Sequence, residues 1–368
     1  MNFDFSDDQK LLKEQVRKFL ADKCPTKVVR RVLDGNETHA DDVWKGLVEL
    51  GVPGTTIPEA YGGLGLTPLE LCVVAEEIGR AAAPVPFDTS VVLATEALKL
   101  AFADRERYYG DPEFVDVPME ALLSAEYARE RRELIHPDKA QSGMPPAGAP
   151  GRGNGAAVPW RGLQPAMEPA GTDLLDTSYL CVVDRNGNVF SATPSDGCTQ
   201  APVVPGTGLV VSTRGSQSWA VDGHASSVAP GKRPRLTPCP AMVFKHGKPY
   251  MPIGTPGGDV QCQSMLQVFL NVAVFGMLPQ AAIEAPRFAT YSYPGSFEPH
   301  AYQPDEVRIE RRLADTVGGA LGAKGHRVVT WPDWTWKAGG VCAITIDRNS
   351  GVLSAGADPR RTSYAIGW

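Results

Sequence analysis

The stretch Asp176-Thr177-Ser178-Tyr179-Leu180-Cys181-Val182-Val183-Asp184 places a hydroxyl residue directly before a strand-like run. A segment rich in Pro and Gly precedes it, so the chain is open to cleavage there. A break between Asp176 and Thr177 gives Thr177 a free α-amine, which can take the proton of its own hydroxyl. The stretch therefore predicts an N-terminal-threonine nucleophile made by self-cleavage. Taken alone, these nine residues favour an ordinary strand start.

The composition is that of a globular protein with an acidic balance. The chain has 368 residues, 43% of them hydrophobic, a formal net charge of -6 and a pI near 5.6. Because Lys and Arg form no blocks, we expect no nucleic-acid partner and no membrane partner. Residues 1–8 are acidic where a signal peptide would be basic, and no apolar run reaches membrane-spanning length. We therefore expect a cytoplasmic protein.

Seven cysteines are scattered along the chain without a CxxC pair or His-rich spacing. This spacing argues against a disulfide framework and favours a reducing compartment. We expect no metal site.

The first third of the chain carries signals of helix starts and ends. Ser6 and Gln9 form a predicted capping box before a helix with one apolar face. A second helix over 44–50 ends at Gly51, which suits a left-handed cap. Thr67-Pro68-Leu69-Glu70 is typical of a third helix start. These patterns predict an all-helical N-terminal module.

The segment 142–173 has no hydrophobic periodicity and is crowded with Gly, Pro and Ala. Such a segment buries too little side-chain surface to offset its ordering entropy. We expect a flexible linker over 142–176 that ends at the cleavage site.

The back half carries three pairs of apolar runs around turn residues. The turns are centred on Asn186-Gly187, His246-Gly247 and Ser350-Gly351, and each predicts an antiparallel hairpin. The runs 263–275 and 313–324 predict helices buried against the sheet. Helices stacked on antiparallel sheets indicate an α+β layered fold.

Three segments of the front third carry a family resemblance: Phe5-Ser6-Asp7-Asp8-Gln9, Pro58-Glu59-Ala60-Tyr61-Gly62-Gly63-Leu64-Gly65 and Glu76-Glu77-Ile78-Gly79-Arg80. Through them, residues 1–97 resemble the N-terminal helical domain of the acyl-CoA dehydrogenases. In that family the flavin and the thioester are held mainly by two later domains, and neither follows here. The resemblance therefore implies packing or dimer contacts. We expect no cofactor, and FAD only if a partner completes the module.

Five segments of the back half carry a second resemblance: Thr177–Asp184, Ser191–Ser195, Gly254–Gly258, Glu284–Phe288 and Asp358–Arg360. Through them, residues 98–368 resemble the γ-glutamyltransferase family, and the pattern is more similar to its branch with oxamate-amidohydrolase-like and acylase-like members. The resemblance implies the end of a large subunit over 98–141 and a small catalytic subunit over 177–368. It also implies an incomplete αββα sandwich of the N-terminal-nucleophile hydrolases after the all-α module. The all-α module takes the place of most of the family's large subunit.

The boundary near residue 98 falls inside an expected helix that starts at Asp88. Both families place a helix there, so we expect one continuous helix across the boundary. A gene fusion and an error of sequence assembly both stay open as explanations.

The resemblance implies catalytic roles that fit the chemistry of the residues. Thr177 would attack an amide carbonyl and form an ester-linked acyl-enzyme that water or an amine resolves. Gly257 and Gly258 lack side chains, so their N–H groups can approach the oxyanion, each contributing roughly 3 kcal/mol. Thr193 would donate or accept a hydroxyl hydrogen bond at the nucleophile or its amine. Without the five matched segments in the same order as in the family, Gly257 and Gly258 would be read as an ordinary turn and Thr193 as an ordinary strand residue.

Four further residues are candidates for substrate binding: Arg214, Ser195, Gln217 and Thr237. The segments around Arg214 and Thr237 depart from those that hold a zwitterionic glutamyl head in the family, and Gly197 stands where the family has Asn. Arg214 suggests an anionic substrate group, and Arg235 is the weaker candidate for that role. We expect a small amide as substrate.

Three hypotheses remain open from the sequence. The leading one is an amidohydrolase or acyltransferase activated by cleavage before Thr177. The second is a flavin-dependent acyl-CoA dehydrogenase fragment, and the third is an inactive chimera in which neither site is complete. An open sheet edge exposes apolar surface, so we also expect self-association through that edge or through the helical module.

Overall fold

The computed structural model describes residues 6–33, 40–52, 55, 64–66, 70, 73–74, 77–78, 88–136, 138–150, 177–196 and 201–368. Several sequence-based predictions lie outside these residues: the helix start at 67–69, the segment 58–63, the linker over 151–176, Asp176 and Gly197.

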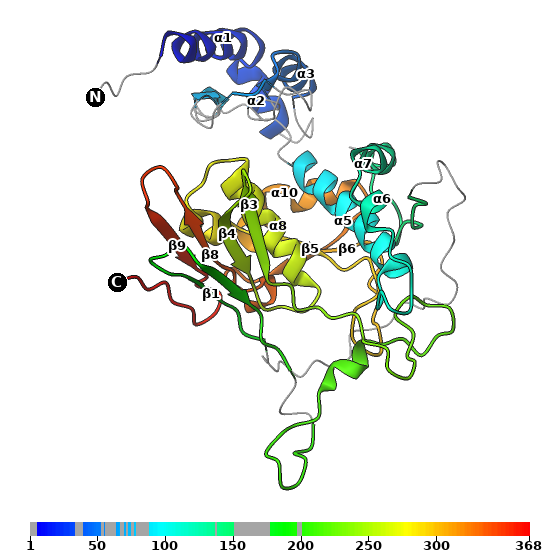
Figure 1. Cartoon of the computed structure of the whole chain (residues 1–368). Helices are drawn as coiled ribbons and strands as arrows, with labels where there is room; N and C mark the ends of the chain where they lie inside the picture. The colour runs from blue at the N-terminus through cyan, green and yellow to red at the C-terminus, as the bar shows by residue number, and fades with distance from the viewer. Residues whose placement is uncertain are drawn as a thin grey trace. The chain divides into compact units, whose positions relative to one another are not determined.

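The chain divides into two compact units, one of residues 1–90 with 269–277 and one of 91–268 with 278–368. The first unit contains the helices α1 (Asp7–Lys23), α2 (Thr26–Leu33) and α3 (Asp41–Glu49), as Figure 1 shows. Their apolar faces share one core, formed by Val16, Leu20, Val43, Leu47, Val52 and Val74. The described part of this unit is helical, as predicted.

The predicted capping box of α1 is confirmed. The Ser6 hydroxyl accepts a hydrogen bond from Gln9 N at 3.2 Å, and the Gln9 side chain accepts one from Ser6 N at 2.9 Å. Gly51, just after α3, has a φ of 74° and so adopts the left-handed conformation expected of it.

Helix α5 (Asp88–Tyr108) runs without a break through residue 98, which confirms the continuous helix. The short helices α6 (Met119–Leu122) and α7 (Ala125–Arg132) follow it. None of the helices in the described ranges is long and apolar enough to cross a bilayer.

Three antiparallel hairpins form where the turn residues predict them. Strands β1 (Leu180–Val183) and β2 (Val189–Ala192) make a two-stranded sheet. Strands β3 (Ala241–Lys245) and β4 (Lys248–Gly254) join β8 (Cys342–Ile346) and β9 (Leu353–Ala357) in a four-stranded sheet of order β3-β4-β8-β9. The β1–β2 hairpin packs against β4 and β8 (Figure 1). The mixed helix and sheet content confirms the α+β class.

Two helices connect and cover these strands. Helix α8 (Val260–Ala273) follows β4, and α9 (Pro279–Glu284) packs against β8 and β9. Gly356 on β9 allows this approach, since a Cβ there would lie 2.7 Å from the Ile283 side chain.

A third sheet was not predicted. It consists of β5 (Phe288–Thr290), β6 (Glu306–Glu310) and β7 (Arg327–Trp331), and α10 (Arg311–Ala323) connects β6 to β7 as a parallel pair. All five residues of β6 are buried, including two glutamates and an arginine. The strand lacks a clean apolar pattern because its charged side chains are buried as ion pairs, such as Glu306 with Arg308.

The predicted linker is wrong at its start. Residues 142–150 have no regular secondary structure, yet hydrogen bonds hold them against other parts of the second unit: Gly143 N donates to Asp305 at 2.6 Å, Met144 N to the Tyr302 hydroxyl at 2.7 Å and Gly148 N to Asp104 at 2.8 Å. Backbone hydrogen bonds to side chains order a segment that lacks periodicity of its own.

Candidate active site

Thr177 lies three residues before β1, where the chain reaches the four-stranded sheet. The Tyr179 ring, two residues later, packs over Gly254 at the end of β4, since a Cβ at Gly254 would lie 2.2 Å from that ring. The bare glycine therefore lets β1 approach β4. Ser178 N donates to Pro194 O at 3.0 Å, and Thr177 forms an isolated antiparallel bridge with Ser195. The candidate nucleophile thus lies beside the hydroxyl run that follows β2.

Ser195 provides the hydroxyl that contacts the candidate nucleophile. Its Oγ lies 2.7 Å from Thr177 Oγ1. Arg214, from the short 3-10 helix η3 (Thr213–Gln217), donates to the same Ser195 Oγ and, through Nε, to Ser195 O at 3.2 Å. Three of the predicted site residues therefore form one hydrogen-bonded chain.

The hydrogen bond expected of Thr193 is made by Ser195. Thr193 Oγ1 is buried and has no hydrogen-bond partner among the described residues. Side chains two residues apart in an extended chain are expected on the same side, so the sequence positions of Thr193 and Ser195 do not separate them. The register of the isolated bridge determines which of the two hydroxyls contacts Thr177, because it pairs Thr177 with Ser195.

Gly257 and Gly258 form a turn that only glycine adopts readily, with φ values of 133° and 56°. They lead directly into α8, where Val260 N donates to Gly257 O at 3.0 Å and Gln261 N to Gly258 O at 3.2 Å. Backbone N–H groups before a helix start are not used inside the helix and favour negative charge. This is the chemistry that an oxyanion requires.

Phe297 connects the glycine pair with the nucleophile side of the site and was not predicted. Its ring lies 4.0 Å from the position of a Cβ on Gly258, and the Arg214 guanidinium lies 5.5 Å from the ring centroid. A lone aromatic in a loop gave no sequence signal of this role. The contacts of Phe297 bring Gly258, Arg214 and Ser195 into one neighbourhood.

A buried ion network supports the glycine pair from the side of η4 (Trp336–Ala338) and β8. Arg287 and Asp358 pair at 2.7 Å, and Asp358 also accepts from Val341 N at 2.8 Å. Arg360 pairs with Asp358 at 3.2 Å and with Glu310 at 2.6 Å. Two of the five family segments therefore contribute buried structural charges.

The same network fixes the loop that touches the glycine pair. Arg287 donates to Ala338 O at 2.9 Å, and Gly340 N donates to Thr255 Oγ1 at 2.7 Å. Between them, Gly339 packs against Gly257, where a Cβ would lie 3.7 Å from the Gly339 Cα.

Two family models match the sequence of this chain. The model of gamma-glutamyltranspeptidase matches residues 67–368. The chain belongs to the gamma-glutamyltranspeptidase family. The model of the acyl-CoA dehydrogenase N-terminal domain matches residues 6–104, so the two matches share residues 67–104. Both sequence resemblances are confirmed.

Relatives of this gamma-glutamyltranspeptidase-family chain include hydrolases and acylases. The glutathione hydrolase proenzyme of Bacillus subtilis (strain 168) is 32% identical over 316 residues, which cover 85% of this chain and 50% of the relative. The Acylase ACY 1 proenzyme of Pseudomonas sp. (strain SE83) is 34% identical over 272 residues, covering 72% and 41%. The chain therefore spans about half the length of these curated relatives.

Solved structures show the same relationship. The cephalosporin acylase from Bacillus halodurans has a TM-score of 0.62 at 30% identity, covering 77% of this chain and 46% of that one. LmbA2991HD has a TM-score of 0.68 at 40% identity, covering 76% and 48%.

The other predicted binding residues do not contact Thr177, Ser195 or Arg214 in the hydrogen bonds described above, and they bind other side chains. Gln217, also on η3, is fully buried and its amide nitrogen donates to Thr237 Oγ1 at 3.2 Å. Arg235, the weaker anion-binding candidate, is in an ion pair with Glu106, with Arg235 Nη2 3.0 Å from Glu106 Oε1. Its guanidinium is therefore committed to a buried carboxylate.

Glu106 on α5 is the centre of a second buried charge cluster, which anchors the chain after Gly258. Arg105 contacts both Glu106, at 2.7 Å, and Asp259, at 2.5 Å. Asp259 in turn accepts from Ser296 N at 2.8 Å, next to Phe297. Burial by itself raises the pKa of Glu106, but the guanidiniums of Arg105 and Arg235 outweigh burial and hold this pKa at about 2.

Glu106→Gln should lower stability in a pH-dependent way. The folded pKa is depressed, so the stabilisation by ionised Glu106 is fully present above the ordinary value of 4.5 and is lost as pH falls toward about 2. We expect Glu106→Gln to lower the free energy of unfolding by about 3 kcal/mol at pH 7, and by progressively less below pH 4.5. Urea unfolding at pH 7, 4 and 3 measures this. Exposed Glu113→Gln is the control, and a constant difference across pH would contradict the prediction.

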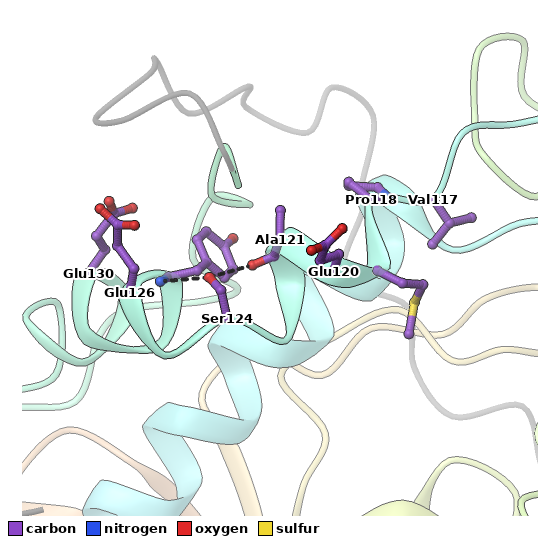
Figure 2. A pocket seen from close by; sticks show the side chains of 9 residues that line it. Val117, Pro118, Glu120, Ala121, Ser124, Glu126 and Glu130 are labelled. Carbon is purple, nitrogen blue, oxygen red and sulfur yellow. Dashed lines mark hydrogen bonds between the residues drawn. The ribbon is translucent and has the colours of Figure 1, made fainter.

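A pocket of about 720 Å³ lies elsewhere in the second unit, along α6 and α7. Figure 2 shows carboxylates of Glu120, Glu126 and Glu130 around it. The Ser124 hydroxyl there caps α7, since it accepts from Tyr127 N at 3.2 Å and donates to Ala121 O at 2.9 Å. None of the predicted site residues lines this pocket, and its only hydroxyls belong to Ser124 and Tyr127.

Proposed function

We propose that this chain is an N-terminal-threonine amidohydrolase or acyltransferase, activated by self-cleavage before Thr177. The single observation that carries the proposal is the 2.7 Å contact between Thr177 Oγ1 and Ser195 Oγ, with Arg214 behind it, in a member of the gamma-glutamyltranspeptidase family. The names of both cited relatives contain the word proenzyme, which supports activation by cleavage.

Self-cleavage is an N-to-O acyl shift. Thr177 Oγ1 attacks the carbonyl carbon of residue 176, the C–N bond breaks, and the hydroxyl proton ends on the Thr177 nitrogen. Water then hydrolyses the ester, which restores the hydroxyl and leaves a free α-amine. The amine is the base that the mature nucleophile needs.

Turnover repeats this chemistry on an external amide. The α-amine takes the Thr177 hydroxyl proton as Oγ1 attacks the substrate carbonyl, and the proton passes to the leaving amine as the C–N bond breaks. The N–H groups of Gly257 and Gly258 would stabilise the oxyanion. Water or an amine then releases the acyl group. None of these steps requires a cofactor.

The substrate we propose is a small amide. The relatives are named for glutathione and cephalosporin chemistry, and both are amides of modest size. We also propose that the β1–β2 hairpin and the four-stranded sheet are layers of an αββα sandwich. This arrangement is supported by the packing of β1 on β4 and β8 and of α9 on β8 and β9.

The apolar outer face of the hairpin supports the proposed self-association. Leu180, Val182 and Phe190 are 44%, 49% and 57% exposed, whereas the strand residues that alternate with them, Cys181, Val183, Val189 and Ser191, are half-buried. Exposed apolar surface of this kind favours burial in an interface. For the N-terminal module we propose a role in packing contacts. The match of the gamma-glutamyltranspeptidase model over residues 67–368 favours the amidohydrolase over the flavin-dependent dehydrogenase fragment.

Intact mass of the purified chain tests the proposal. We expect two fragments that divide between Asp176 and Thr177, together with hydrolysis of at least one of three probes, the p-nitroanilides of acetic acid, succinic acid and γ-linked glutamic acid. A single chain that stays undivided after prolonged incubation and hydrolyses none of the probes would rule the function out. Absorbance of a bound flavin would instead favour the dehydrogenase fragment.

A further inference from the structure

Arg214 holds Ser195 at two points. Its Nε donates to the Ser195 carbonyl at 3.2 Å, and its Nη2 donates to the Ser195 hydroxyl. Arg214 is 7% exposed, and its guanidinium lies over the Phe297 ring. Next to it, Glu298 N donates to Ser216 O at 2.8 Å and ties η3 to the Phe297 loop. The guanidinium is therefore held in one orientation against Ser195.

The direction of the hydrogen bond between Arg214 and Ser195 follows from the chemistry of the two groups. A guanidinium can only donate, so Ser195 Oγ accepts from Arg214. The one proton of the Ser195 hydroxyl is then free to be donated to Thr177 Oγ1, 2.7 Å away. Donation from a cation to Ser195 polarises its O–H bond and strengthens the next hydrogen bond in the chain.

We propose that Arg214 is a positioning residue of the nucleophile, acting through Ser195, rather than a binding site for an anionic substrate group. The inference rests on the proposed function of Thr177. Ser195 donates to one lone pair of Thr177 Oγ1, which leaves the Thr177 proton directed at its own nitrogen. As Oγ1 gives up this proton, the chain from Arg214 stabilises the negative charge that develops there. Ser195 and Arg214 keep their protons throughout.

The proposal is tested by a double-mutant cycle of Arg214→Gln and Ser195→Ala. The readouts are the rate of chain division before Thr177, followed by intact mass, and kcat and KM with acetyl- and succinyl-p-nitroanilide. We expect Arg214→Gln to slow division and kcat by roughly 10- to 100-fold, equally for the neutral and the anionic acyl group. In the Ser195→Ala background, Arg214→Gln should lower the rate of division and kcat by less than about threefold, because Arg214 acts on Thr177 only through the Ser195 hydroxyl, which this variant lacks.

A pH profile separates positioning from structural support. Removal of the Arg214 charge favours protonation of the nearby Thr177 α-amine, so the acid limb of kcat should move to higher pH in Arg214→Gln. Arg214→Lys keeps the charge but not the two-point contact, and it should lose rate with a smaller shift of that limb. Arg348→Gln, an exposed arginine that donates to Pro249 O at 3.0 Å, is the control for loss of one arginine.

Two results would overturn the inference. One is full multiplicative loss in the double variant, and the other is a rise in KM confined to succinyl-p-nitroanilide, which would make Arg214 the substrate's anion site. Thermal unfolding checks that each variant is folded. If Arg214→Gln does not fold, Arg214→Lys takes its place in the cycle with the same criteria. A wild-type chain that does not divide contradicts the proposed function itself, whereas either of the two results above contradicts only the inference about Arg214.

Discussion

Thr177→Ala should leave one undivided chain with no measurable amidase activity. The substitution removes the only atom that attacks in both self-cleavage and turnover, so neither the N-to-O shift nor the acyl-enzyme can form. Loss of a hydroxyl nucleophile lowers turnover by about 10³-fold or more. Intact mass over several days and p-nitroaniline release from the probes measure the two effects.

Two further variants sharpen the test at Thr177. Thr177→Ser keeps the hydroxyl and should still divide, whereas Thr345→Ala, a strand threonine on β8 that donates to Ser354 O at 3.4 Å, should behave as wild type. Division of Thr177→Ala at the same bond would show that another group, or a contaminating protease, makes the cut.

Asp358→Asn should lower the free energy of unfolding by about 3–5 kcal/mol, because it removes one partner from a fully buried ion network. Arg287 and Arg360 both contact this carboxylate, and both are almost fully buried. Urea unfolding at pH 7 measures the loss.

The Asp358 change should also reach the active site. Asp358 accepts a hydrogen bond from Val341 N. The residues just before Val341, Gly339 and Gly340, contact Gly257 and Thr255. We therefore expect slower chain division in the variant under conditions where it is still folded. Asp315→Asn, exposed on α10, should stay within about 0.5 kcal/mol of wild type. A similarly small effect of Asp358→Asn would mean that the network does not support the glycine pair.

Local sequence signals were enough for the secondary structure wherever one turn or cap decides it. Asn186-Gly187 and His246-Gly247 predict their hairpins because these residues readily take a positive φ, and Gly187, His246 and Gly247 have φ values of 80°, 51° and 73°. The capping box at Ser6 is equally local. By contrast, β6 escaped prediction because charged residues stand at its buried positions, and one of them, Glu310, is paired with Arg360, which is distant in the chain.

Family order in the sequence identified Thr177 and the glycine pair, but the partners of each are a matter of tertiary structure. Thr193 and Ser195 both follow β2, two residues apart, and only the register against Thr177 gives the contact to Ser195. An arginine near the site suggests an anionic ligand, and only the fold shows that Arg214 is bound to Ser195 and Arg235 to Glu106.

The sequence by itself therefore determined the family, the α+β class, the candidate nucleophile and the hairpins around it, because each depends on local conformation or on the order of motifs. The tertiary structure decided which hydroxyl faces Thr177, that Phe297 joins the two halves of the site, and that residues 142–150 are held in place. These features depend on hydrogen bonds and packing between residues far apart in the chain. No local pattern specifies such contacts, since their energies arise only when the fold has brought the groups together.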